Sequence, residues 1–116
     1  MLALVCGGRA VTDRAYVFAR LDAFRAALGI DAIIHGAARG ADRIAGEWAV
    51  ARGIPVRAFP ADWDRHRKSA GPIRNRRMLD ERPDCVIAFM GGKGTADCIR
   101  QATARLVRVY PHDEAL

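Results

Sequence analysis

Three glycine-rich segments each follow a short apolar run, and their composition suits the binding of an anion. They are Cys6-Gly7-Gly8-Arg9, His35-Gly36-Ala37-Ala38-Arg39-Gly40 and Met90-Gly91-Gly92-Lys93-Gly94-Thr95. Glycine lets backbone N–H groups approach an oxyanion, and a helix that begins directly after such a loop adds the positive end of its dipole. Loops that follow parallel strands share one edge of a sheet, where open α/β folds bind ligands. The pattern therefore predicts a phosphate pocket at that edge.

The third segment carries the strongest signal, because its glycines stand beside Lys93 and Thr95 at the expected start of a helix. It is not a Walker A loop, since the spacing G-x-x-x-x-G-K-[ST] occurs nowhere in the chain. The spacing G-x-G-x-x-G is also absent, so a dinucleotide fingerprint is not supported. The pair Gly7-Gly8 is equally typical of a tight turn with no ligand.

The net charge of +6 is concentrated in one segment. Residues 65–82 hold seven basic and two acidic side chains, which leaves a surplus of +1 for the rest of the chain. A concentrated basic segment indicates an anionic partner, although a solvated arginine-rich helix has the same composition. Within it, Arg74 is expected to clamp phosphate and Asn75 to bond a sugar or base, while Arg76 and Arg77 face solvent or a partner subunit.

Several other residues have both a chemical and a structural interpretation. Trp63 can stack on a base or cover the edge of the sheet. Asp42 and Glu47 are carboxylates on one expected helix, and Asp42 is the better candidate for a helix cap. His35 ends a strand, where a structural role is more common than ligand contact. Cys98 lies near a helix start, which can lower a thiol pKa, but without a paired histidine an inert packing role is favoured.

Apolar runs alternate with helical patterns along the chain and define the elements that position these residues. Strands are expected at 2–6, 31–35, 54–58, 84–89 and 106–110, and helices at 13–28, 42–52, 72–81 and 95–105 with Thr95 as a cap. Trp48 is expected in the core, and the polar stretch 59–70 has no expected element. Alternating strands and helices predict a Rossmann-like three-layer α/β sandwich of about five parallel strands in the order 3-2-1-4-5, with helices on both faces.

The overall composition limits the class of protein. A chain of 116 residues with 51% hydrophobic and 28% charged residues predicts one globular domain, 1–116. Neither a membrane span nor a signal peptide is visible, so a cytoplasmic protein is expected. Cys6, Cys85 and Cys98 form no CxxC pair, which disfavours a disulfide framework and a zinc site. We expect no metal and no cofactor.

Four spaced motifs together resemble one known family. The motifs are Gly36-Ala-Ala-Arg39-Gly40-Ala-Asp42, Pro60-Ala-Asp62-Trp63, Gly71-Pro-Ile-Arg74-Asn75 and Gly91-Gly-Lys-Gly94-Thr95-Ala-Asp97. In this order, from Val5 to about Ala102, they resemble the YspA/YpsA-related branch of the SLOG superfamily. That resemblance implies a Rossmann-like domain that binds nucleotides or nucleotide-derived ligands. Relatives in the superfamily include the Lonely Guy phosphoribohydrolases, which cleave the N-glycosidic bond of nucleoside 5′-monophosphates, and DNA-processing protein A, which binds single-stranded DNA.

The hydrolases of this superfamily carry the motifs P-G-G-x-G-T-x-x-E and R-K-x-x-M. The matching residues of this chain are Gly91, Gly92, Gly94, Thr95, Arg74 and Met78. Three positions depart from the motifs: Met90 replaces the proline, Asn75 the lysine and Cys98 the catalytic glutamate. Asp97 is adjacent to Cys98 but points about 100° away on a helix. The resemblance therefore supports the phosphate site more than the hydrolase chemistry.

Three hypotheses follow for the function. The first is a sensor or accessory domain that binds a 5′-phosphorylated nucleoside through the Gly91–Thr95 loop, with Arg74 supported by Arg9, Arg39 or Lys93. The second is an N-glycoside hydrolase in which Glu47 or Asp42 replaces the missing glutamate and Arg74 orients the substrate. The third is single-stranded nucleic-acid binding through 65–82, which has only Trp63 as a nearby aromatic. The resemblance to dimeric hydrolases also implies a homo-oligomer, and no membrane partner is expected.

Overall fold

The computed structural model describes residues 1–116 and contains one sheet of five parallel strands. The strands are β1 (Leu2–Cys6), β2 (Ala32–His35), β3 (Val56–Ala58), β4 (Cys85–Ala88) and β5 (Arg108–Pro111). Their order across the sheet is β3-β2-β1-β4-β5, and Leu4 of β1 lies between Ile34 of β2 and Val86 of β4. The predicted α/β class, strand number and strand order are confirmed.

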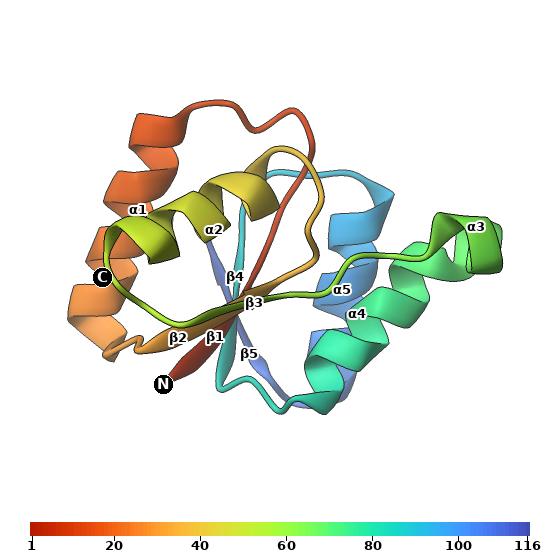
Figure 1. Ribbon diagram of the computed structural model, residues 1–116. Coiled ribbons are helices and arrows are strands. Elements are labelled where there is room, and N and C mark those ends of the chain that lie inside the picture. Colours follow the sequence, from red (N-terminus) through yellow and green to blue (C-terminus); the bar gives the residue numbers. More distant parts are fainter.

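Helices cover both faces of the sheet (Figure 1). The helices are α1 (Arg14–Leu28), α2 (Ala41–Ala51), α3 (Trp63–His66), α4 (Ala70–Asp80) and α5 (Lys93–Ala104). Helices α1 and α2 lie on one face, and α4 and α5 lie on the other. None of these helices combines the length and the apolar composition that a membrane-spanning segment requires.

The stretch 59–70, for which no element was expected, contains the short helix α3 and a 3₁₀ turn at Arg67–Ser69. Asp62 starts α3, because its carboxylate accepts a hydrogen bond from the backbone N–H of Arg65 at 3.1 Å. Only four residues follow before the chain turns at Arg67, which has a positive φ of 54°. The polar composition concealed this element because α3 buries none of its side chains.

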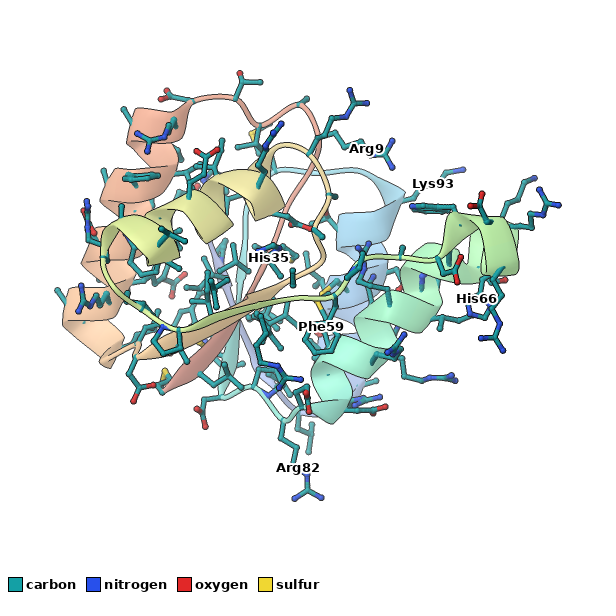
Figure 2. All side chains as sticks on the ribbon, in the orientation of Figure 1. Arg9, His35, Phe59, His66, Arg82 and Lys93 are labelled. Atoms are coloured by element: carbon teal, nitrogen blue, oxygen red, sulfur yellow. The ribbon has the colours of Figure 1, made fainter.

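The two ends of the sheet differ in what gathers there. Arg82, which follows α4, projects from the end where the strands begin, whereas Arg9 and Lys93 project from the end where they finish (Figure 2). The glycine-rich segments follow β1, β2 and β4, so all three occupy this second end. The topology therefore brings the predicted anion-binding loops together.

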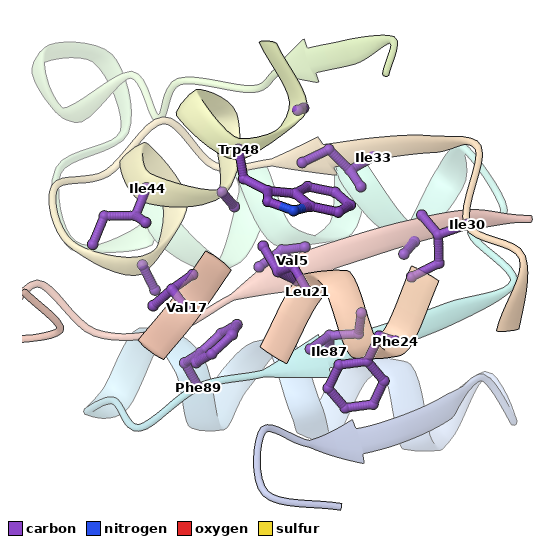
Figure 3. Close-up of a cluster of buried hydrophobic side chains, with 14 of the residues drawn as sticks. Val5, Val17, Leu21, Phe24, Ile30, Ile33, Ile44, Trp48, Ile87 and Phe89 are labelled. Carbon is purple, nitrogen blue, oxygen red and sulfur yellow. The ribbon is translucent and has the colours of Figure 1, made fainter. Parts of the chain in front are cut away.

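Buried apolar side chains fix each helical layer to the sheet. On the α1 and α2 face, Trp48 packs in a cluster with Leu21 and Phe24, all fully buried (Figure 3). On the α4 and α5 face, Met78 and Leu79 pack against a second cluster from the strands. The prediction that Trp48 belongs to the core is confirmed, and its indole Nε1 donates to Asp22 at 2.8 Å.

Two helix starts differ from expectation. Thr95 does not cap α5, because the helix begins earlier, at Lys93, with Gly92 as its N-cap. Asp42 does not cap α2, since it lies in the first turn after the N-cap Gly40. Neither glycine has a side chain to bond the first N–H groups. At α2 the N–H of Ala41 donates instead to the carbonyl of Gly8 at 3.2 Å, whereas the first amides of α5 have no partner.

Candidate functional site

A pocket of about 950 Å³ opens at the carboxyl ends of β1, β2 and β4. Its walls come from the three glycine-rich segments, the segment before α3, and the first turns of α4 and α5. The predicted site residues that line it are Gly7, Gly8, Arg9, Gly36, Arg39, Asp42, Trp63, Arg74, Asn75, Gly92, Lys93, Gly94 and Thr95. A pocket of this size suits a small organic ligand.

Gly40 and Gly91 were predicted to contact the ligand but do not line the pocket. Both allow the loops to approach closely. A Cβ on Gly40 would overlap the carbonyl oxygen of Gly8, and one on Gly91 would lie 2.8 Å from the backbone nitrogen of Gly8. Their contribution in this structure is therefore to bring the loops after β1, β2 and β4 into contact.

The start of α5 presents three backbone amides toward the pocket. The first intrahelical bond runs from Ala96 N–H to the carbonyl of Gly92 at 3.0 Å, so the amides of Lys93, Gly94 and Thr95 have no partner within the helix. No acidic residue lies in this first turn. The free amides, the helix dipole and the Lys93 ammonium together favour an anion.

Arg74 reaches from α4 across the pocket to the loop after β2. Its Nη1 donates to the carbonyl of Gly36, and its Nε donates to Asn75 Oδ1 at 2.9 Å. A side chain on Gly36 would collide with the guanidinium, so this glycine makes room for Arg74. The Nη2 end of the guanidinium has no partner in the structure and remains available for a ligand.

Asn75 connects α4 to α5 instead of facing a ligand with free polar atoms. It is buried, and its Nδ2 donates to the carbonyl of Gly94 at 3.1 Å and to Asp97 Oδ2 at 3.0 Å. Asp97 also accepts hydrogen bonds from Arg100 at 2.6 Å and Gln101 at 2.7 Å. Since Asp97 is fully paired, it holds the start of α5 in place.

Asp42 is the buried carboxylate of the pocket wall whose hydrogen bonding is incomplete. Its Oδ2 accepts from the backbone N–H groups of Gly36 at 3.2 Å and Ala38 at 3.3 Å, while Oδ1 is buried without a partner. Burial raises the pKa of Asp42 to about 6, opposed by these amides and by the charge of Arg74. The prediction that Asp42 caps a helix is replaced by a role in holding the 36–38 loop.

Glu47, predicted as a catalytic candidate, is not brought to the pocket. Its carboxylate pairs with Arg14 of α1 at 3.1 Å on the exposed surface of α2. Glu47 is five positions after Asp42, which places the two about 140° apart around the helix. The spacing in the sequence alone would have shown that Asp42 and Glu47 cannot both face the pocket.

His35 lies outside the pocket lining, whereas Cys98, for which an inert packing role was favoured, is buried and lines the pocket. His35 is buried outside the pocket lining, and its Nδ1 accepts from the N–H of Ala37 at 3.0 Å. Burial lowers the pKa of His35, assisted by the charge of Arg74. Cys98 and Cys6 are both buried and line the pocket, and the nearby Cys98 thiol together with burial raises the pKa of Cys6 well above its usual value.

Two basic residues of the pocket were not predicted. Lys68 comes from the 3₁₀ turn, and Arg100 comes from the second turn of α5, where it pairs with Asp97. The spacing of Lys93, Asp97 and Arg100 at i, i+4 and i+7 was an available signal that they share a helix face. Lys68 offered no such signal, because α3 and the turn after it were not predicted.

The charge of the pocket is strongly positive. Six basic side chains line it: Arg9, Arg39, Lys68, Arg74, Lys93 and Arg100. Of the seven bases in 65–82, only Lys68 and Arg74 belong to this set, so the segment supplies part of the wall and the remainder lies outside. Arg76 and Arg77 are exposed, as expected.

Trp63 lies on the rim of the pocket and is 48% exposed. Its ring packs near Gly71 at the start of α4, where an added Cβ would lie 3.5 Å from the indole. The indole therefore has support from the protein on one side and solvent on the other. Such a platform suits stacking by a planar group.

The fold and the pocket define an α/β domain of the Rossmann-like class with a basic, glycine-lined site at the carboxyl edge of its sheet. The chain belongs to the YspA, cpYpsA-related SLOG family (YAcAr), whose family model matches residues 1–66. It is similar to the Gene 61 protein of Mycobacterium phage D29, with 36% identity over 108 residues that cover 85% of this chain and 86% of that protein. No solved structure matches the chain.

Proposed function

We propose that this domain binds a nucleotide or a 5′-phosphorylated nucleoside-derived ligand, as a sensor or as an accessory to another activity. The observation that carries the proposal is the start of α5, where three free amides and Lys93 face a pocket lined by five further bases. A phosphate there accepts hydrogen bonds from the amides and neutralises the local charge. Arg74 contributes the free end of its guanidinium.

The remainder of the pocket suits the organic part of such a ligand. Trp63 offers an exposed aromatic surface on the rim for a base. The volume of about 950 Å³ accommodates a phosphate, a sugar and a base together. A site for inorganic phosphate alone would need neither the volume nor the aromatic surface.

The direct test is mass spectrometry of small molecules released when freshly purified protein is denatured, followed by calorimetric titration with the four common nucleoside 5′-monophosphates. Replacement Lys93→Ala is expected to weaken binding about tenfold, since a hydrogen bond to a charged group contributes about 1.5–3 kcal/mol. Arg82→Ala is the charge-matched control at the opposite end of the sheet (Figure 2). Absence of any bound phosphate compound in both assays would contradict the proposal.

Hydrolysis of the N-glycosidic bond is the second candidate, and Asp42 is the observation that favours it. A carboxyl with a pKa of about 6 in a ligand pocket can donate a proton to a departing base, while water adds to the sugar carbon and releases its own proton to solvent. Neither Glu47 nor Cys98 supplies that group, because one lies outside the pocket and the other carries no carboxylate. The test is chromatographic detection of free base from a nucleoside monophosphate that binds; binding without base release counts against it.

Single-stranded nucleic acid has weaker support as a ligand. Arg65, Arg67, Arg76 and Arg77 are exposed outside the main pocket and supply a basic surface. Trp63 is the one exposed large aromatic near them, whereas strand binding ordinarily uses several stacking platforms. A gel-shift titration at increasing salt tests this reading, which predicts a steep loss of affinity.

A further inference from the structure

The carboxylate of Asp42 combines burial, incomplete hydrogen bonding and a position in the wall of the pocket. The side chain is 95% buried, given a relative exposure of 5%. Its Oδ1 is enclosed with no donor, although buried acceptors in proteins nearly always have one. A pocket-lining acceptor without a donor is a feature that a bound ligand can complete.

The existing bonds of Asp42 leave room for a stronger partner. Both amide bonds to Oδ2, from Gly36 and Ala38, are longer than 3.1 Å. The loop that donates them turns through Ala37, whose φ of 59° is unfavourable for a residue with a side chain. Because Oδ1 is enclosed, a ligand donor reaches it only if this loop moves.

The surroundings of Asp42 identify which part of a nucleotide it meets. Asp42 lies in the first turn of α2, and Gly40 before it packs on the carbonyl of Gly8. Gly8 in turn contacts Gly91, beside the phosphate-binding start of α5. The exposed ring of Trp63 lies on the α3 rim instead. Asp42 lines the same pocket as both of these groups, so the sugar that connects phosphate and base is the part of the ligand left for it.

We infer that Asp42 is a specificity-determining residue that accepts a hydrogen bond from a sugar hydroxyl of the ligand through Oδ1. This inference rests on the proposed nucleotide-binding function and deepens it, since it selects ribose-containing ligands over their deoxy counterparts. No other carboxylate can take this role in the pocket, because Asp97 is already paired with Asn75, Arg100 and Gln101.

The charged and titratable groups around Asp42 come from three other elements. Arg74 of α4 favours the ionised carboxylate, the pKa of Cys6 of β1 is raised well above its usual value, and burial lowers the pKa of His35 of β2. A hydroxyl that donates to Oδ1 also favours the ionised form, so ribose binding near pH 6 releases a proton from Asp42. The phosphate of either ligand also titrates near pH 6, so it contributes equally to both. A deoxy ligand that lacks the donating hydroxyl should therefore release fewer protons in total.

The experiment is a calorimetric cycle with wild-type protein and Asp42→Asn. The ligands are the best-binding nucleoside 5′-monophosphate of the common four and its 2′-deoxy and 3′-deoxy counterparts, each titrated at pH 6 in two buffers of different ionisation heat. In the wild type, one deoxy ligand is expected to bind about tenfold more weakly and to release fewer protons. In Asp42→Asn the preference for the ribose ligand over that deoxy ligand should fall below about threefold, and the difference in proton release between the two should disappear.

The outcomes separate this inference from the function on which it rests. Equal affinities for ribose and deoxy ligands in the wild type, or an unchanged preference in Asp42→Asn, overturn the role of Asp42 and leave nucleotide binding intact. An equal loss for all three ligands in Asp42→Asn overturns the sugar contact in favour of a base contact or a purely structural role. No binding of any monophosphate, nor of inorganic phosphate, overturns both proposals. The melting temperature of Asp42→Asn, compared with that of the wild type, checks that the variant is folded.

Discussion

Arg74 of α4 donates a hydrogen bond through Nη1 to the carbonyl of Gly36, and this bond joins the two walls of the pocket. Gly36 lies in the loop between β2 and α2, which covers one face of the sheet, and Arg74 lies in α4, which covers the other face. The guanidinium is therefore fixed before any ligand arrives. A pre-positioned cation loses less conformational freedom when it binds an anion than a mobile one does.

Replacement Arg74→Lys tests the importance of this fixed geometry. Lysine keeps the positive charge but cannot donate to Gly36, Asn75 and a phosphate in the planar arrangement of a guanidinium. We expect nucleoside monophosphate affinity to fall about tenfold, measured by calorimetry. Arg76→Lys, at an exposed position of the same helix, should leave affinity unchanged. Equal affinities for the two variants would show that charge alone matters at position 74.

Gly40 is expected to be intolerant of any side chain. Its backbone has φ 81° and ψ −127°, a region open essentially to glycine, and an added Cβ would overlap the Gly8 carbonyl. Gly40→Ala should lower the free energy of unfolding by at least about 2 kcal/mol, measured by urea denaturation.

Gly53 provides the matched control for this backbone effect. It also has a positive φ, 67°, but nothing lies within 4 Å of an added Cβ. Gly53→Ala should therefore cost only about 1 kcal/mol, the ordinary penalty of a left-handed conformation. Similar losses for both variants would mean that the contact with Gly8 contributes nothing to stability.

The fold could be predicted from the sequence because local signals agreed with one another. The apolar runs at β1 and β4 require cover on both faces, which places them at the centre of a parallel sheet. The glycine-rich turns then had to gather at one edge. The helix faces were equally readable, since Val17, Leu21 and Phe24 recur at helical spacing and are all buried.

The errors at the site arose where tertiary contacts decide a residue's role. Asn75 beside Arg74 has the composition of a ligand-binding pair, yet its amide is used to connect α4 with Gly94 and Asp97. No local pattern distinguishes these two uses of an asparagine. Lys68 was missed for a related reason, because its approach to the pocket depends on a short turn with no buried side chain.

The buried carboxyl of Asp42 makes stability depend on pH in an unusual direction. Its pKa is about 6 in the folded state and 3.8 in the unfolded chain, so the folded protein binds more protons between these values. Stability should therefore fall as pH rises from about 4 to about 6 and then level off. A shift of this size corresponds to about 3 kcal/mol.

Asp42→Asn removes this titration and isolates its contribution. The difference in unfolding free energy between wild type and Asp42→Asn, measured by urea denaturation from pH 4 to pH 8, should shift in favour of the variant as pH rises. Asp64→Asn, which makes the same substitution on the exposed surface of α3, is the control measured in parallel. A pH-independent difference for Asp42→Asn would mean that its carboxyl is not raised in the folded protein.

Asp22 should make the protein more stable as pH rises, the opposite of Asp42, and it should do so at lower pH. Hydrogen bonds from Arg52 at 2.8 Å and from Trp48 at 2.8 Å lower the pKa of Asp22 to about 2, below its unfolded value of 3.8. Its contribution is therefore present above about pH 4 and is lost as pH falls toward 2. Because Asp22 is at the surface and screened by water, we expect only about 1 kcal/mol from it.

Asp22→Asn is the test of this contribution, with thermal and urea unfolding measured at pH 7 and at pH 2. At pH 7 the variant should be less stable by about 1 kcal/mol, since Arg52 loses its charged partner and Trp48 retains a weaker acceptor. At pH 2 the two proteins should differ by less, because the wild-type carboxylate is then partly protonated. Asp113→Asn, an exposed position near the C-terminus, should match the wild type at pH 7. A deficit that is the same at both pH values would assign the effect to packing around Trp48 and not to the charge of Asp22.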